Sequence, residues 1–334
     1  MTNKTISILG TGRIGKMHAE LIARQVPGLD VAAVYDVYGE SAQAVAADIG
    51  CDVAASVEEI MASGVDSVAI CSSTDTHVDL TVAAAEAGKA IFLEKPVSLD
   101  LAEVDRALGA VEAAGVPIQI GFNRRFDDSH AAVQQAVASG SIGDLHMLRI
   151  TSRDPTPPPI EYIKVSGGIF CDMTIHDFDM ARFVSGSEIV EVYAKADVRI
   201  DPAIGEAGDV DTAVVILTHE NGAITTIDNS RQAVYGYDQR VEAFGSAGMA
   251  VSENPLSHTA ELHTAAGTQI ATVPYFFLER YVPSYLAGWS AFVEGLASGN
   301  MPITGPDGRA PLVAGLAAWK SVREGRPVRC DEIG

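Results

Sequence analysis

The side chains best suited to chemistry lie in residues 168–182, which read GIFCDMTIHDFDMAR. This stretch places Asp172, His176 and Asp179 at spacings of four and then three residues, so one helix would present all three on a single face. Apolar residues lie between them, which favours a helix packed against a core. A histidine beside a carboxylate can accept a proton near neutral pH, because the carboxylate orients the imidazole and stabilises its charged form. The stretch therefore predicts a site for proton transfer.

Two other chemical uses of this stretch are weaker. The same three side chains could bind a metal ion, but no second histidine stands at a suitable spacing, and we expect no metal. Cys171 could act as a nucleophile, yet nothing adjacent to it marks an activated thiolate. The four cysteines of the chain form no Cys-x-x-Cys pair, and they fit the reduced thiols of a cytoplasmic protein.

A cofactor for this chemistry is indicated near the N-terminus. Residues 5–9 predict a short strand, Gly10, Gly12 and Gly15 follow it, and a helical pattern comes next. Gly-x-Gly-x-x-Gly between a strand and a helix is the fingerprint of a dinucleotide site, with glycines for the tight turn, the approach of the pyrophosphate and close packing. The helix N-terminus adds free N–H groups and a positive dipole. We expect the whole turn, including Arg13 and Ile14, to contact the cofactor.

The identity of the cofactor depends on Asp36, which ends the next predicted strand, residues 30–36. A carboxylate at this position accepts hydrogen bonds from the adenosine ribose and repels the additional phosphate of NADP. Val37 follows it, with no Lys or Arg immediately after to bind that phosphate. We therefore expect NAD. The alternative is that Asp36 only caps the next helix.

Polar residues also follow three further predicted strands, residues 66–71, 90–93 and 117–122. The carboxyl ends of parallel strands form the ligand crevice of an open sheet, and Lys95 there could steady a developing alkoxide. The residues that we expect to contact the cofactor are Ser72, Ser73, Thr74, His77, Glu94 and Lys95.

These expectations have simpler alternatives. His77 could be a solvated turn histidine, and Glu94 with Lys95 could form only a surface ion pair. Arg124 and Arg125 could hold substrate hydroxyls, position a neighbouring carboxylate or serve the fold alone.

The length of 334 residues predicts two domains, each with its own core. Alternating strands and helices make residues 1–122 a Rossmann dinucleotide-binding domain of the α/β class. Residues 123–334 predict an α+β domain with a mostly antiparallel open sheet that presents the substrate. The last helix, residues 311–324, is assigned to this domain, with packing against the first domain as the alternative.

Composition limits the partners. Lys and Arg total 23 against 44 Asp and Glu, which gives a net charge of −21 and argues against binding nucleic acid or an anionic membrane. The first residues run directly into a strand and resemble neither a signal peptide nor a transit peptide. No apolar run approaches the length that crosses a membrane.

Four motifs together resemble one family. These are the glycine turn, Glu94-Lys95-Pro96, the segment GFNRRFD at residues 121–127, and Asp172-x-x-x-His176. In this combination and order the chain resembles the glucose–fructose oxidoreductase/inositol dehydrogenase family, and within it the inositol 2-dehydrogenases. The narrower likeness is carried by residues 152–155, 166–183 and 235–246.

The resemblance implies an NAD-dependent oxidation of myo-inositol to its 2-keto compound, scyllo-inosose, by a homotetramer built through the open sheet. It places the catalytic residues on Lys95, Asp172 and His176, with His176 as the general base. The substrate contacts that it implies are Lys95, Arg124, Asp154, Asp172, His176, Asp179 and Tyr235. Other members carry His or Asn near Asp154, where this chain reads Arg-Asp-Pro, so the preferred inositol stereoisomer is left open.

Other functions fit parts of the same pattern. The chain could oxidise another cyclitol or an aldose, such as scyllo-inositol or glucose. It could be a lyase that recycles bound NAD, or a regulator that binds NAD without turnover. Retention of Lys95, Asp172 and His176 argues against the regulator, which would not need a complete set of proton-transfer residues.

The cofactor assignment gives a first testable prediction. The double substitution Asp36→Ser, Val37→Arg should shift the preference from NAD toward NADP, because it removes the repelling carboxylate and adds a phosphate-binding cation. The measurement is kcat/KM with each cofactor. An unchanged ratio would show that Asp36 does not select the cofactor.

Overall fold

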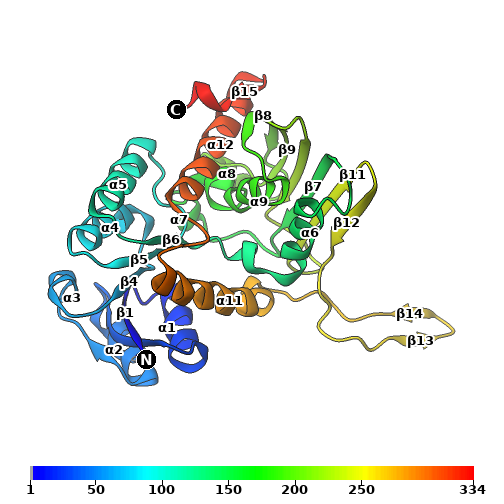
Figure 1. Ribbon diagram of the computed structural model, residues 1–334. Coiled ribbons are helices and arrows are strands. Elements are labelled where there is room, and N and C mark those ends of the chain that lie inside the picture. Colours follow the sequence, from blue (N-terminus) through cyan, green and yellow to red (C-terminus); the bar gives the residue numbers. More distant parts are fainter. Residues whose placement is uncertain (1–2) are drawn as a thin grey trace. The chain divides into compact units, whose positions relative to one another are not determined.

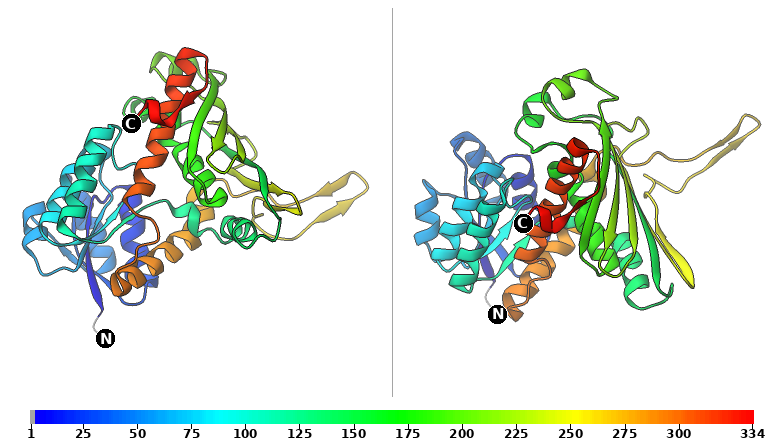
Figure 2. Two further views of the ribbon diagram at one scale, coloured as in Figure 1. Left: turned by 45° about the horizontal axis from the view of Figure 1, so that its top comes forward. Right: turned by 90° about the horizontal axis from the view of Figure 1, so that it is seen from above.

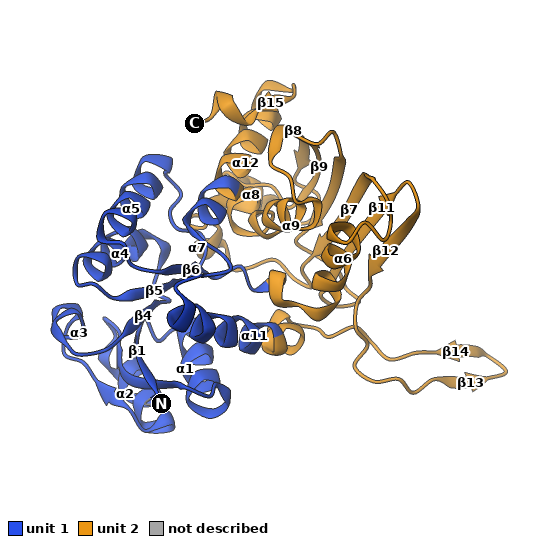
Figure 3. Cartoon of the chain, viewed as in Figure 1, with its two compact units in different colours: residues 1–123, 284–310 blue, residues 124–283, 311–334 orange. Residues whose placement is uncertain are grey.

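The computed structural model describes residues 3–334 (Figure 1) and divides the chain into two compact units (Figure 3). Unit 1 takes the chain up to Asn123 together with Ser284–Ala310, and unit 2 takes Arg124–Pro283 and Pro311–Gly334. The first crossing lies one residue from the boundary expected from the sequence.

One expectation about the domains needs correction. The segment Ser284–Ala310, assigned above to the second domain, belongs to unit 1, and the last helix belongs to unit 2 from Pro311 onward. The physical reason is apolar packing, because Trp289 and Phe292 lie in the same core as Phe92 of the first domain.

Unit 1 contains a six-stranded parallel sheet in the order β3-β2-β1-β4-β5-β6, which is the Rossmann order. Its strands are β1 Lys4–Leu9, β2 Leu29–Tyr35, β3 Asp52–Val53, β4 Ser67–Ile70, β5 Ala90–Leu93 and β6 Ile118–Ile120. Its helices are α1 Arg13–Gln25, α2 Gly39–Ile49, α3 Val57–Ala62, α4 His77–Glu86, α5 Leu101–Ala114 and most of α11 Phe277–Ser298. The strand order reverses between β1 and β4, which places the ligand crevice at the carboxyl ends of these strands.

Unit 2 contains a seven-stranded sheet in the order β12-β11-β7-β10-β9-β8-β15. Its strands are β7 Leu145–Arg153, β8 Ile189–Asp197, β9 Thr212–His219, β10 Ile224–Ser230, β11 Asp238–Gly245, β12 Gly248–Ser252 and β15 Val328–Arg329. The pairing of β7 with β10 is parallel and the other pairings are antiparallel, so the sheet is mixed but mostly antiparallel, as the sequence predicts.

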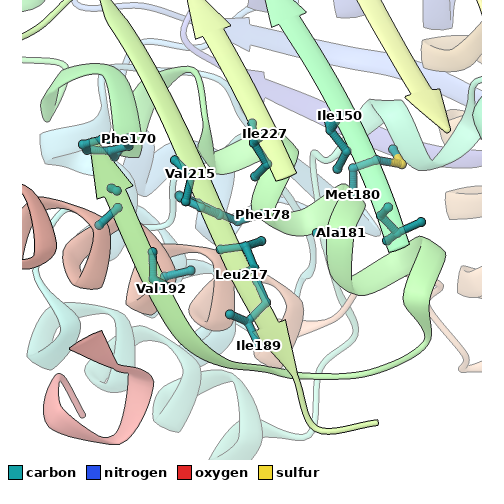
Figure 4. Packing of buried hydrophobic residues seen from close by; sticks show 14 of the residues in the cluster. Ile150, Phe170, Phe178, Met180, Ala181, Ile189, Val192, Val215, Leu217 and Ile227 are labelled. Atoms are coloured by element: carbon teal, nitrogen blue, oxygen red, sulfur yellow. The ribbon is translucent and has the colours of Figure 1, made fainter. Parts of the chain in front are cut away.

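Helices cover one face of this sheet (Figure 2). They are α6 Asp128–Ala138, α8 Gly168–Asp172, α9 Ile175–Ser185 and α12 Gly305–Glu324, with the short helices α7 Ile160–Ile163 and α10 Pro202–Glu206 nearby in the chain. Phe170 and Phe178 pack on the buried residues of the strands, such as Val215 and Leu217 of β9 (Figure 4). The alternate residues of β9, Val214 and Ile216, face the other side and are exposed.

The stretch of residues 168–182 is not one helix, contrary to the sequence expectation. It forms α8 and α9, which are interrupted at Met173 and Thr174. The reason is tertiary, because the Thr174 hydroxyl donates to Asn229 Oδ1 at 2.7 Å, and Asn229 lies on β10. Asp172 therefore ends α8, and His176 lies in the first turn of α9.

The hairpin of β13 Leu262–Thr264 and β14 Gly267–Gln269 extends away from the rest of unit 2 (Figures 1 and 3). Ser257 N–H and the Ser257 hydroxyl both donate to the Thr272 carbonyl oxygen at its base. Among the described residues, no helix combines the length and hydrophobicity needed to cross a membrane.

Candidate active site

The glycine turn of unit 1 has the shape that a dinucleotide requires. Gly10 has a φ of 94°, and a Cβ there would lie 2.6 Å from the Ser72 backbone. A Cβ on Gly15 would overlap the Gly10 carbonyl oxygen, whereas a Cβ on Gly12 would meet nothing within 4 Å. Gly10 and Gly15 thus allow close packing, and Gly12 leaves open space at the N-terminus of α1.

Asp36 joins β2 to this turn. Its Oδ2 accepts from the Thr11 N–H at 2.6 Å and from the Thr11 hydroxyl at 3.1 Å, and its Oδ1 accepts from the Tyr38 N–H at 2.8 Å. The alternative that Asp36 caps α2 is not supported, since the cap residue of α2 is Tyr38. Contact between Asp36 and a ribose stays a prediction.

His77 connects two of the loops that follow strands. Its Nδ1 lies 2.8 Å from the Pro96 carbonyl oxygen, and its Nε2 lies 3.2 Å from the Ser72 carbonyl oxygen. The side chain is buried, and burial lowers the pKa of His77. It is therefore not a solvated turn histidine. Ser72 also exchanges a hydrogen bond with Thr76 at 2.6 Å, while Ser73 and Thr74 lie at the start of the following turn.

Glu94 forms a buried contact that sequence reasoning missed. Its Oε1 lies 2.8 Å from His18 Nε2. The role of Glu94 is therefore not limited to a surface ion pair with Lys95. His18 lies on α1, three residues after Gly15, and this position beside the glycine fingerprint was the available signal.

In unit 2, Asp172 is fixed by two donors. Its Oδ1 accepts from the Tyr162 hydroxyl at 2.8 Å, and its Oδ2 accepts from Arg231 Nη1 at 3.3 Å. Arg231, only 1% exposed, also donates to Asp209 Oδ2 at 3.3 Å. Asp209 Oδ1 in turn accepts from the Ile169 N–H at 2.9 Å at the start of α8. One guanidinium thus stabilises both ends of the helix that carries Asp172.

Beside His176 lies a carboxylate that sequence reasoning did not select. Asp177 forms a buried ion pair with Arg124 at 2.7 Å and accepts from Asn229 Nδ2 at 2.8 Å. Burial raises the pKa of Asp177, and Arg124 opposes that shift. Arg124 also donates to the Tyr237 hydroxyl at 3.3 Å. These bonds fix the first turn of α9 and hence the backbone of His176. The available signal for Asp177 was its place next to that histidine.

Two residues expected to contact the substrate make other bonds. Asp179 is buried, and Arg125 Nε donates to both of its oxygens, at 3.1 and 2.9 Å. The Tyr235 hydroxyl donates to Asp238 Oδ2 at 2.6 Å and accepts from Arg153 Nη1 at 3.0 Å. Substrate contact by either residue stays a prediction.

The charges of the Asp172 and Asp177 networks act on the carboxyl of Asp154. Burial raises the pKa of its carboxyl to about 6, Arg231 and Arg124 oppose the shift, and Asp172 and Asp177 add to it. Its N–H donates to the Ser230 carbonyl oxygen, which places it at the end of β7 next to β10. A group of carboxylates and guanidiniums of this kind can accept from and donate to several hydroxyls of one polyol. Within residues 3–334 we find no cluster of His, Cys, Asp or Glu suited to a metal ion.

The chain is similar to known proteins over nearly its whole length. The family model described as "Oxidoreductase family, NAD-binding Rossmann fold" matches residues 4–122, and the "GFO/IDH/MocA C-terminal domain" matches residues 130–251. The chain is 47% identical over 331 residues to the myo-inositol 2-dehydrogenase of Thermotoga maritima, covering 98% of this chain and 99% of that protein. It is 45% identical to the inositol 2-dehydrogenase of Rhizobium meliloti, covering 96% and 97%.

A solved structure extends the comparison. The scyllo-inositol dehydrogenase from Lactobacillus casei, with bound NAD(H) and scyllo-inositol, superposes with a TM-score of 0.92 at 28% identity. The match covers 99% of this chain and 100% of that chain.

The position of Asp154 predicts a pH effect on stability. Its folded pKa of about 6 lies above the value of about 3.9 in an unfolded chain. Between those values the folded state keeps a proton that the unfolded state has released, so this group's contribution to stability falls as pH rises through the interval. Asp154→Asn should flatten that part of the profile, measured as the free energy of unfolding in urea from pH 4 to 7. The exposed Asp52→Asn is the control, and equal profiles for both variants would contradict the prediction.

Proposed function

Because the chain belongs to the GFO/IDH/MocA oxidoreductase family, we propose that it is an NAD-dependent inositol 2-dehydrogenase that oxidises myo-inositol to scyllo-inosose. The observation that carries this proposal is the pair of Asp172 and His176, set on successive helices, with Asp172 fixed by Tyr162 and Arg231. It is supported by the near full-length similarity to two inositol 2-dehydrogenases.

In the proposed mechanism the substrate C–H bond breaks as a hydride leaves, and the hydroxyl loses its proton. NAD, when bound, accepts the hydride. His176 takes the proton as general base, and Asp172 stabilises the imidazolium that forms. Lys95 stabilises the negative charge that develops on the alcohol oxygen. Arg124 and Asp154 hold further hydroxyls, while the glycine turn and Asp36 bind the dinucleotide.

A second candidate is oxidation of scyllo-inositol or another cyclitol. The Lactobacillus casei structure favours this alternative, because a protein with the same fold binds scyllo-inositol. The test is a panel of myo-inositol, scyllo-inositol and glucose with NAD and with NADP, followed by absorbance of the reduced cofactor. We expect NADH from myo-inositol. The absence of NADH with every polyol would exclude both dehydrogenase functions and leave the regulator or the lyase.

We also infer a homotetramer that assembles through the open face of the unit 2 sheet. On this face Met147 of β7 pairs with Phe244 of β11, which pairs with Met249 of β12. Their exposed fractions are 47, 47 and 56%, so an apolar row crosses three strands. A second copy of the chain would bury such a row.

The projecting hairpin supports the same partner. Residues 254–275 contain Glu261 as their one acidic residue and no Lys or Arg, in a chain of net charge −21. Leu256, Leu262 and Ile270 are exposed there. A two-stranded hairpin is marginally stable alone in water. A weakly charged, apolar hairpin fits burial against another copy of an acidic chain.

The compartment that we propose is the cytoplasm. All four cysteines are free thiols, which suits a reducing environment.

The catalytic assignments predict how two variants behave. His176→Ala should abolish turnover while NAD still binds, because the cofactor fingerprint lies in the other unit. Lys95→Met should lower kcat by at least about 100-fold, the scale of a positioned acid–base or electrostatic group. Steady-state kinetics and calorimetric titration of NAD measure both. Near-normal turnover of Lys95→Met, or loss of NAD affinity in His176→Ala, would contradict the roles.

The assembly predicts a change of oligomeric state. Phe244→Lys should dissociate the tetramer, because it places a charge at the centre of the apolar row. Replacement of residues 258–271 by Gly-Gly should do the same, and this deletion keeps the Ser257–Thr272 contact at the base of the hairpin. Light scattering after gel filtration gives the mass. Val53→Lys, at an exposed position on β3 of unit 1, is the matched control. Intact tetramers in the first two variants would place the interface elsewhere.

A further inference from the structure

His18 is the most completely enclosed ionisable group of the cofactor unit that the chemistry above does not use. Its exposed fraction is 0%. The ring packs edge-on against Phe92, Tyr285 and Trp289, at centroid distances of 5.2, 5.3 and 5.3 Å. These neighbours come from β5 and α11, so three elements of unit 1 meet at one imidazole.

The hydrogen bonds of His18 determine its protonation pattern. Trp289 Nε1 lies 2.9 Å from His18 Nδ1, and an indole N–H can only donate. Nδ1 must therefore accept, which leaves the ring proton on Nε2. Nε2 lies 2.8 Å from Glu94 Oε1 and donates to it. The order of donation is Trp289 to His18 to Glu94, and it requires a neutral imidazole.

Glu94 is confined on its other side as well. It follows β5 directly, and its N–H donates to the Ile70 carbonyl oxygen at 3.0 Å. A Cβ on Gly121 would lie 2.9 Å from Glu94 Oε1, so the carboxylate packs against bare backbone at the end of β6. Few other orientations of the carboxylate are open to it.

The residue after Glu94 is Lys95, and the next is Pro96, whose carbonyl oxygen lies 2.8 Å from His77 Nδ1. Lys95 is thus flanked by two residues that are each held by a buried histidine. The histidine contact to Pro96 is made through backbone, whereas the contact to Glu94 is made through a side chain.

We propose that His18, fixed in one tautomer by Trp289, is a positioning residue that orients Glu94 and thereby the loop that carries Lys95. This inference rests on the proposed function for its kinetic consequences. It gives α11, which lies far from the glycine turn in sequence, a part in the cofactor crevice. A small misplacement of a catalytic group can cost about 100-fold in rate, so the effect should appear in kcat.

The kinetic experiment compares His18→Leu, His18→Gln and His219→Leu. His18→Leu should lower kcat about 10- to 100-fold with little change in the KM for myo-inositol. His18→Gln should recover part of that loss, because its amide can still donate to Glu94. His219 is the matched control, since it is also buried and bonds Thr225 at 2.8 Å, but lies on β9 of unit 2. Full kcat in His18→Leu, or an equal loss in His219→Leu, would overturn the proposal.

A spectroscopic experiment tests the same contact without turnover. Nitrogen-15 histidine spectra of the wild-type protein at pH 7.5 should show His18 neutral with its proton on Nε2, assigned by the signal that His18→Gln removes. Trp289→Phe should move the Nδ1 resonance. A proton on Nδ1, a charged ring or an unmoved Nδ1 resonance would overturn the proposed order of donation. If the wild-type chain oxidises no polyol, the proposed function fails while these spectra still decide the role of His18.

Discussion

The ion pairs of the buried Arg231 guanidinium are the interactions on which the end of unit 2 that carries Asp172 depends. The guanidinium bonds Asp172 at the end of α8 and Asp209, which in turn bonds the N–H of Ile169 at the start of that helix. A five-residue helix has little stability of its own, so α8 depends on tertiary contacts such as those of the Arg231 guanidinium. Removal of one partner would leave a buried charge uncompensated, at a cost of about 3–5 kcal/mol. The carboxylate proposed to be catalytic and the local fold therefore share one stabilising contact.

In unit 1 the constraint is different, because the dinucleotide that we propose for it would approach backbone rather than side chains. Gly10 and Gly15 bring the turn against Ser72 and against itself, and no side chain occupies the space beside Gly12. Asp36 accepts hydrogen bonds from Thr11, so the carboxylate expected to select the cofactor also shapes the turn that is expected to bind it. The candidate site residues are thus positioned by closely packed glycines in unit 1 and by paired charges in unit 2.

The sequence predicts those features that depend on neighbours along the chain. Strand, glycine turn and helix lie within residues 4–25, and the mostly antiparallel sheet expected in residues 123–334 is formed, because apolar alternation is a local pattern. The break between α8 and α9 was not predictable, since it depends on Thr174 meeting Asn229 from a distant strand. Assignment of Ser284–Ala310 to unit 1 likewise depends on Trp289 packing on Phe92. Composition alone does not reveal such pairings.

The same limit applies to the acidic residues around His176, which look alike in sequence. Asp177 and Asp179 are each buried against an arginine, Arg124 and Arg125, and these arginines follow one another in the chain. Two adjacent ion pairs of this kind fix the rotation of α9 about its axis. Asp172 differs because its donors, Tyr162 and Arg231, come from two separate segments rather than from adjacent residues. The role of each carboxylate depends on which donors bond to it. The spacing of Asp172, His176 and Asp179 in the sequence does not reveal those donors.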